Sequence, residues 1–401
     1  MRALVRAVRL IDGVAATPRD GVDVLIEGAL IAAVGPHDPG REVSDATTVV
    51  DGAGRTLLPG LIDAHAHYTF DPTEGSLQVI AQRADDVILA AARVNAERAL
   101  RAGITTARGA GSIRNLECVL RDEIAAGRTP GPRLVAAGTA VGSVSGHGSA
   151  FGLEAAGEEG FAAATRQVID AGADVVKVVA SEAAMLTTTG LPPGVDVFGA
   201  PELTGDELRG VVSVARAADR RVMAHAQDSE SVRRCAISGV TSVEHAWLAD
   251  DAAIEAVAVS GAWLVPTLVV TDVNRTLPGL TRVERERQDL IEIRHRASTE
   301  AAVRLGIPLA TGTDTGEVGV TADMVWREIV LLRDHGATAL AAIHAATSSA
   351  ARLLGVDGEV GTVETGKWAD LVLVEGDPLA DPTELARPVA VWQRGRPVLS
   401  A

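Results

Sequence analysis

Two histidines separated by one residue, His65 and His67, end an apolar stretch that covers residues 58–64. The Pro-Gly pair within this stretch and the aliphatic residues after it are typical of a buried strand. Because side chains alternate between the two faces of a strand, both imidazoles point the same way and can hold one metal ion. Two polar residues on a solvated strand face would leave the same pattern, so the metal interpretation depends on further ligands elsewhere.

Further residues of the kinds that bind metals end or interrupt other apolar stretches. They are Lys177 within 175–180, His225 within 221–226, His245 at the end of 242–245 and Asp314 at the end of 307–314. Imidazole and carboxylate ligands suit Zn²⁺ or a similar divalent ion. We therefore predict a metal site that includes His65, His67, Lys177, His225, His245 and Asp314.

Lys177 is unusual because it stands between two pairs of valines, where a charged amine is costly to bury. Three interpretations compete. The side chain extends to the end of the strand, or it pairs with an acid such as Asp314, or CO₂ carboxylates it. The carbamate fits best, since it would bridge two metal ions that an ammonium group would repel.

The elements that must position these residues alternate between strands and helices over about 300 residues. The expected strands are residues 58–67, 104–108, 133–138, 175–180, 221–226, 242–245, 263–267 and 307–314. About eight strand–helix repeats with apolar strands predict an α/β fold, a (β/α)₈ barrel over residues 59–354. Residues 1–58 and 355–401 contain short strands, so we expect a small accessory β-sandwich built from both chain ends.

Such a barrel carries its chemistry at the carboxyl ends of its strands, which is where the predicted ligands lie. The chain of 401 residues has a net charge of -16 and no basic patch with interleaved aromatics, which argues against nucleic acid and anionic membranes as partners. The two cysteines do not form a disulfide framework, and we find no signal peptide or spanning segment. We expect a cytoplasmic protein with a small-molecule substrate.

The motif over residues 58–67 resembles the entry motif of the amidohydrolase superfamily. The resemblance continues through Lys177, His225, His245 and residues 310–314, and ends in the Gly-Lys-Trp-Ala-Asp-Leu-Val segment at 366–372, so it covers essentially the whole chain. Residues 239–245 and 145–148 look most like the prolidase-like branch. That branch includes Xaa-Pro dipeptidases and the ochratoxin-hydrolysing enzyme.

The resemblance implies two divalent metal ions, with Zn²⁺ expected. By position, His65, His67 and Asp314 would hold one metal, His225 and His245 the second, and carboxylated Lys177 would bridge them. It also implies two catalytic residues, Asp314 and His147. Asp314 would pass a proton from the shared hydroxide to the leaving amine, and His147, in a glycine-rich loop, would help to stabilise the oxyanion.

The sequence departs from the branch in three loops. Arg108 is followed by Gly109 rather than an acid, the segment after the lysine strand is Ser181-Glu182-Ala183, and His225 is followed at one remove by Gln227-Asp228. We expect these loops to line the substrate pocket, so dipeptide specificity is not carried over. Whether His147, Arg108, Gln227 and Asp228 contact substrate is left open.

The leading hypothesis is a binuclear amidohydrolase that cleaves the amide bond of an N-acyl amino acid or dipeptide-like compound, with a carbamate, urea or lactam as variants. One alternative is a deaminase of an aminated heterocycle with a single metal, against which Lys177 argues. Lactone or phosphoester hydrolysis at the same centre is another. A non-catalytic scaffold should have lost ligands, and this chain has lost none. We also expect a homo-oligomer.

Overall fold

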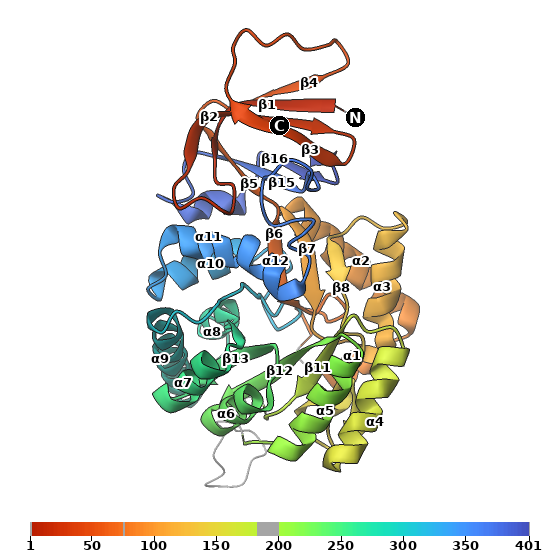
Figure 1. Ribbon diagram of the computed structural model, residues 1–401. Helices are drawn as coiled ribbons and strands as arrows, with labels where there is room; N and C mark the ends of the chain where they lie inside the picture. The colour runs from red at the N-terminus through yellow and green to blue at the C-terminus, as the bar shows by residue number, and fades with distance from the viewer. Residues whose placement is uncertain (1, 75–76, 183–199, 401) are drawn as a thin grey trace.

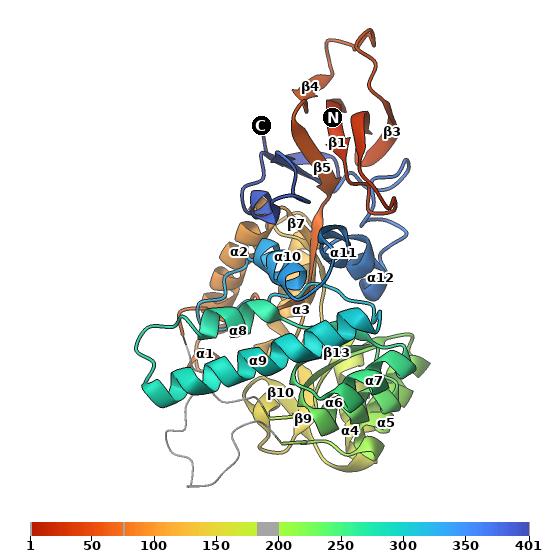
Figure 2. The ribbon, with the colours of Figure 1, turned by 90° about the vertical axis from the view of Figure 1, so that its left-hand side faces the viewer.

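The computed structural model describes residues 2–74, 77–182 and 200–400. Strands from both ends of the chain lie together at one end of the molecule, and the helices and the remaining strands form the rest (Figures 1 and 2). The elements that carry the predicted ligands all belong to this second part.

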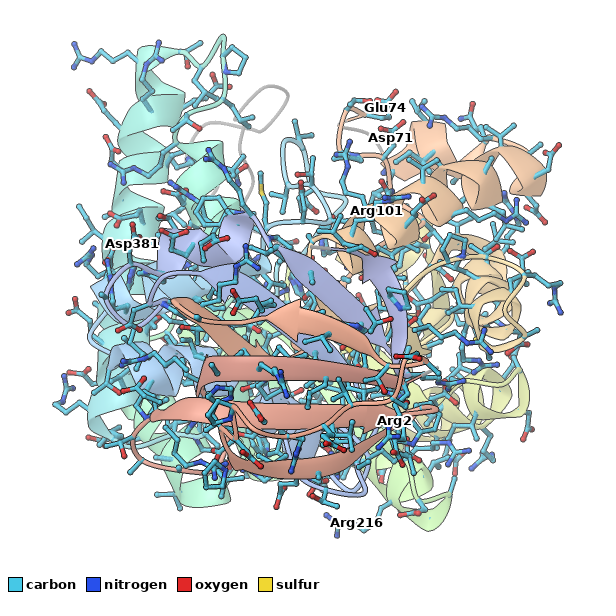
Figure 3. All side chains as sticks on the ribbon, turned by 90° about the horizontal axis from the view of Figure 1, so that it is seen from above. Arg2, Asp71, Glu74, Arg101, Arg216 and Asp381 are labelled. Carbon is cyan, nitrogen blue, oxygen red and sulfur yellow. The ribbon has the colours of Figure 1, made fainter. Side chains whose placement is uncertain are left out.

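The terminal strands form one mixed sheet of eight strands. These are β1 (Arg2–Leu10), β2 (Arg19–Glu27), β3 (Leu30–Pro36), β4 (Thr48–Asp51), β5 (Arg55–Pro59), β15 (Leu371–Glu375), β16 (Ala390–Gln393) and β17 (Arg396–Leu399). β5 pairs with β15 in antiparallel register, which confirms that strands from both chain ends pair with each other, while the β-sandwich stays a prediction. Figure 3 shows this sheet from above. The domain boundaries at residues 58 and 355 stay a prediction.

The other strands form two parallel sheets. One contains β6 (Leu61–Ala66), β7 (Ile104–Gly109) and β8 (Arg133–Val135); the second, in spatial order, contains β10 (Gly152–Ala155), β9 (Ala140–Ser143), β11 (Val175–Val179), β12 (Arg221–Asp228), β13 (Ser242–Leu248) and β14 (Trp263–Val265). β6, β7, β11 and β13 are buried along their whole length, as expected for parallel strands covered on both faces. The sequence did not predict the short strands β9 and β10.

Twelve helices occur in the described ranges. They are α1 (Leu77–Ala81), α2 (Asp85–Arg101), α3 (Leu116–Ala125), α4 (Gly157–Asp170), α5 (Gly205–Ala217), α6 (Ser229–Ser238), α7 (Asp251–Ser260), α8 (Leu268–Asn274), α9 (Arg282–Arg304), α10 (Val325–Asp334), α11 (Ala339–Ala345) and α12 (Ser348–Leu354). Residues 338–354 form two helices and not one, because Thr347 leaves the helical region at φ -137° and ψ -101°. Within the described residues, no helix combines the length and apolar character needed to cross a membrane.

The segment 307–314, expected as the eighth strand, is not a regular strand. It has single parallel bridges from Leu309 to Leu264 of β14, and from the following Thr315 to Ala66 of β6. A continuous ladder is interrupted because Asp314 has φ 57°, and because Gly312 passes so close to His65 that a Cβ there would lie 2.6 Å from the His65 Cβ. The segment still joins the edge of one parallel sheet to the edge of the other.

The long helix α9 is anchored by a buried histidine, His295. Its Nδ1 lies 3.0 Å from the Thr271 hydroxyl, and its ring centroid lies 5.9 Å from that of Trp247. Burial, with the nearby His335, lowers the pKa of His295 to about 3. The folded protein therefore keeps this ring neutral at pH values where the unfolded chain protonates it.

We expect His295 to make folding stability depend on pH. Its contribution is complete above the unfolded pKa of about 6.5 and is lost as pH falls toward 3, by at most about 1.4 kcal/mol per pH unit. His295→Gln, which keeps a polar group for Thr271, should weaken this dependence. Urea denaturation of both proteins between pH 4 and 7 checks this, and equal pH slopes would contradict it.

Candidate metal centre

Three buried side chains converge in a geometry that suits a metal ion. His65 comes from β6 and His245 from β13, while Asp314 ends the segment 307–314. One ligand atom from each lies within 4.8 Å of the others. The His65 Nε2 is 3.2 Å from the Asp314 Oδ1. Three of the six predicted ligands therefore form one compact group.

The other three predicted ligands surround this group. The His67 Nε2 is 3.4 Å from the Asp314 Oδ1, and the Lys177 Nζ is 3.3 Å from the His65 Nε2. The ring of His225 lies 4.5 Å from that of His245, measured between centroids. All six side chains are thus brought to one place, although only His65, His245 and Asp314 meet the stricter distance limit.

Hydrogen bonds at Nδ1 leave the Nε2 atoms of three histidines available. His65 Nδ1 is 2.7 Å from the Glu244 Oε2, and His67 Nδ1 is 2.9 Å from the Gly111 carbonyl oxygen. Both partners only accept, so each Nδ1 carries the proton and each Nε2 presents its lone pair. His245 Nδ1 is 2.9 Å from the Thr267 hydroxyl, which itself donates to the Pro266 carbonyl and therefore accepts from the histidine.

Two Nε2 atoms at the centre have no hydrogen-bond partner in the described part of the chain. The Nε2 atoms of His225 and His245 are buried and unpaired among the residues that the structure describes. A buried polar atom without a partner is destabilising, so such atoms are rare unless something else satisfies them. Burial also lowers the pKa of His225 and His245 well below the usual value, which keeps both rings neutral and able to bind a cation. The donor set therefore fits a divalent metal ion.

Glu244 supports the centre through a hydrogen bond from His65 Nδ1, and it was not predicted as a functional residue. Its carboxylate accepts from His65 and from Arg108, whose Nη2 lies 3.0 Å and 3.1 Å from the two carboxylate oxygens. Burial alone would raise the pKa of Glu244, but Arg108 and the hydrogen bond from His65 lower it to about 2. A charged residue next to His245 inside an apolar strand was the signal that could have identified it.

The backbone is strained where it presents these side chains. His245, Thr267 and Asp314 have φ values of 74°, 57° and 57°, a left-handed region that residues other than glycine rarely adopt. In a regular strand Glu244 and His245 would face opposite sides, yet both contact His65. The positive φ at His245 accompanies this departure from alternation. Strain of this kind is typical of functional sites.

A model of the amidohydrolase family matches residues 56–398. The chain belongs to the amidohydrolase family.

This amidohydrolase, a hydrolase of carbon–nitrogen bonds, is similar to the ochratoxinase of Aspergillus niger, with 26% identity over 374 residues that cover 85% of this chain and 75% of the relative. It is also similar to a Xaa-Pro dipeptidase structure with methionine bound in the active site, with TM-score 0.86, 26% identity and 99% of both chains covered. A prolidase complexed with N-methylphosphonate-L-proline gives TM-score 0.86, 25% identity and full coverage of both chains. The predicted superfamily and branch are confirmed.

His147 of the amidohydrolase lies in a short 3₁₀ helix, residues His147–Ala150, at the edge of the centre. Its ring centroid is 4.9 Å from that of His225, while the residue as a whole is exposed. Its backbone N–H donates to the Glu202 Oε1 at 2.7 Å, and the Ser143 hydroxyl donates to the other oxygen of the same carboxylate. Glu202 therefore holds the loop in place, and the catalytic role of His147 stays a prediction.

The three divergent loops have different positions relative to the centre. Arg108 is buried and bound to Glu244, so it supports His65 from the interior. Gln227 is buried and its N–H donates to the Ser181 hydroxyl, whereas Asp228 caps α6 by accepting from the Ser231 N–H. Ala183 lies outside the described residues.

The acid expected after Arg108 is replaced by a carboxylate from another element. Glu117, on α3, is buried and accepts from the backbone N–H groups of Ala137 and Gly138, both at 2.9 Å. A Cβ built on Gly109 would lie 1.7 Å from the Glu117 Oε1. The Glu117 carboxylate therefore occupies the space that a side chain at position 109 would need.

Loss of the Glu244 charge should weaken metal binding and the fold together. Glu244→Gln leaves the buried Arg108 without a counter-charge, so we expect roughly 3–5 kcal/mol less stability. Metal affinity should fall by about 10–100-fold, since the His65 ring loses its charged support. A metal titration against a competing chelator measures the second effect, with Glu255→Gln on the exposed face of α7 as the control. Unchanged affinity would contradict the supporting role.

Residues 109 and 117 should show strong non-additivity. We expect Gly109→Asp to destabilise the otherwise unchanged protein by at least about 1–3 kcal/mol, because the new side chain overlaps Glu117. In a Glu117→Ala background the same change should raise stability, since it restores the missing carboxylate. Urea denaturation measures both. Gly160→Ala, at a helix position with nothing within 4 Å, is the control and should stabilise slightly. Additive effects at 109 and 117 would contradict the replacement.

Proposed function

We propose that this amidohydrolase is a binuclear metal enzyme that cleaves the amide bond of a small N-acyl amino acid or dipeptide-like compound. The observation that carries the proposal is the convergence of five metal-ligand side chains and one lysine, with two buried Nε2 atoms unpaired among the described residues. A catalytic centre on this fold lies where several strands end, which these positions satisfy.

The assignment of ligands follows the positions of the side chains. His65, His67 and Asp314 would hold one metal ion, and His225 and His245 a second, with Zn²⁺ the expected metal. Bound ions of this kind lower the pKa of water and polarise a substrate carbonyl. The Lys177 Nζ lies 3.3 Å from the His65 Nε2, and the rings of His65 and His245 are 4.9 Å apart between centroids, which supports a bridging role for the lysine.

Lys177 is suited to carboxylation. Burial lowers the pKa of its amine to about 8, although Glu244 and Asp314 act in the opposite direction. Roughly a tenth of the side chain is then the neutral amine at pH 7, which is the form that attacks CO₂. The amine nitrogen bonds to the CO₂ carbon and releases one proton, which gives an anionic carbamate. The negative charge would be compensated by the two metal ions.

The remaining chemistry belongs to Asp314 and His147. Asp314 is held ionised: burial would raise its pKa, but His65 and His67 lower it well below the usual value. An ionised carboxylate at this position can accept a proton from the attacking water and deliver it to the leaving amine. His147, beside His225 and exposed, is placed to donate a hydrogen bond to the carbonyl oxygen of a bound substrate.

The substrate class draws support from the relatives. The Xaa-Pro dipeptidase structure has methionine bound in its active site, and the prolidase structure is a complex with a proline derivative, so both proteins bind small amino-acid compounds. Because three loops of this chain differ from the branch, the proposal names the class and not a dipeptide. The same proposal includes a homo-oligomer in the cytoplasm.

We also propose that the two parallel sheets form one (β/α)₈ barrel. The 307–315 segment bridges β14 and β6 on one side. On the other side, the N–H groups of Asp174 and Val175 donate to the Ala136 carbonyl, which links the end of β8 to the start of β11. These contacts support a ring of strands around the ligand cluster.

A second candidate is a deaminase of an aminated heterocycle with one metal ion. It is favoured by the compact group of His65, His245 and Asp314, which alone meets the distance limit for one shared ion among the described residues. In that case Lys177 would stay an amine, and His225 would contact substrate instead of metal.

Metal content per chain separates the two candidates. We expect close to two ions per chain in protein purified without chelator, and fewer than one in Lys177→Ala, with hydrolysis of N-acyl amino acids lost in parallel. The chain has only two lysines, so a ¹³C carbamate signal after ¹³C-bicarbonate labelling can be assigned by comparing Lys177→Ala with Lys367→Ala. Short carboxylates should partly restore metal to Lys177→Ala. One ion per chain, unaffected by Lys177→Ala, would overturn the binuclear proposal and favour the deaminase.

A further inference from the structure

A cavity of about 1230 Å³ lies between the terminal sheet and the opposite end of the parallel strands from the metal centre. Arg133 begins β8, Asp174 immediately precedes β11 and Arg220 immediately precedes β12, so these lining residues mark the amino ends of the strands. Arg394 and Arg396, at the turn between β16 and β17, line the side formed by the terminal sheet. Neither candidate function uses this cavity.

The lining is strongly basic in an otherwise acidic protein. Five arginines line the cavity, namely Arg121, Arg133, Arg220, Arg394 and Arg396, together with one carboxylate, Asp174. The whole chain has 53 acidic and 37 basic residues, so an excess of this kind is not expected by chance. Asp174 is already occupied, because it accepts from Arg121 at 2.8 Å and from the Ala136 N–H at 3.0 Å.

Several guanidinium groups have hydrogen-bonding capacity left. In the described part of the chain, no carboxylate lies within ion-pair distance of Arg394 or Arg396. Arg133 uses Nη1 for Asp370, but its buried Nη2 has no partner there. Arg133 and Arg394 both lie over the Trp368 ring, with their guanidinium carbons 4.5 Å and 3.9 Å from its centroid. The indole holds these two cations in place, and the Arg394 guanidinium has no carboxylate partner in the described part of the chain.

We propose that this cavity is a second binding site, for a small molecule that carries carboxylate or phosphate groups on a partly apolar body. Guanidinium groups bind both anions through paired N–H donors. Apolar side chains such as Leu100, Ile124 and Val398 share the lining and would contact the body of the ligand. The site is independent of the metal centre and of the proposed function.

The test uses the metal-loaded full-length protein and isothermal titration calorimetry at constant ionic strength. Glutarate is the probe for carboxylate and inorganic phosphate the probe for phosphate, with chloride as the reference. We expect saturable binding of at least one probe, weakened about tenfold or more by Arg394→Gln and by Arg396→Gln, because each removes one charged donor. Arg396 is exposed, so its variant reports binding even if Arg394→Gln fails to fold.

Arg282→Gln is the matched control, since it removes the same charge from the exposed start of α9. Its affinity should equal that of the unchanged protein. If Arg282→Gln weakened probe binding equally, the loss of affinity would come from the overall charge of the protein, and the proposal would be overturned. Binding that survives Arg394→Gln and Arg396→Gln would assign the anion to the metal centre and also overturn it, as would the absence of saturable binding for both probes.

Discussion

The buried pair of Arg108 and Glu244 is the interaction on which the metal centre depends. Arg108 on β7 reaches Glu244 on β13, and also donates to the Ala64 carbonyl on β6 and the Ser242 hydroxyl. These contacts tie three strands from two sheets together through charge-assisted hydrogen bonds. A pair of buried charges contributes little net stability compared with apolar side chains, but removal of either partner is strongly destabilising. Its effect is therefore to fix geometry: it sets the position of His65 and the nitrogen that carries its proton.

Neutral hydrogen-bond partners fix the protonated nitrogen of the other histidines in the same way. A carbonyl oxygen fixes the proton of His67, and a hydroxyl that donates elsewhere fixes that of His245. His65 and His67 thereby present their Nε2 atoms 3.2 Å and 3.4 Å from the Asp314 Oδ1. Burying several imidazoles and a lysine together would by itself destabilise the fold, because burial disfavours the charged form of each group. A metal ion would offset this cost, since neutral imidazole and carboxylate both bind a cation.

The sequence allowed most of the elements and the convergence of the candidate ligands to be predicted, for physical reasons that also explain the failures. Lys177 and His225 interrupt long apolar strands, and a polar residue in such a position is informative. The 307–314 segment reads as a strand by composition, but its positive φ at Asp314 depends on contacts with His65 that no local pattern encodes. Thr267 and the Gly111 carbonyl left no signal at all, since a backbone oxygen has no residue type and threonine is common in strands.

The exchange at positions 109 and 117 shows why the substrate is harder to infer than the metal centre. In this chain a carboxylate from α3 fills the space beside Gly109 of β7 and accepts from the backbone N–H groups of Ala137 and Gly138. Metal ligands cannot be exchanged in this way, because their distances and directions to a shared ion are fixed within a few tenths of an ångström. Loops around the centre have no such constraint. They can change the residue that faces a substrate without disturbing the ligands, so the substrate has to be measured.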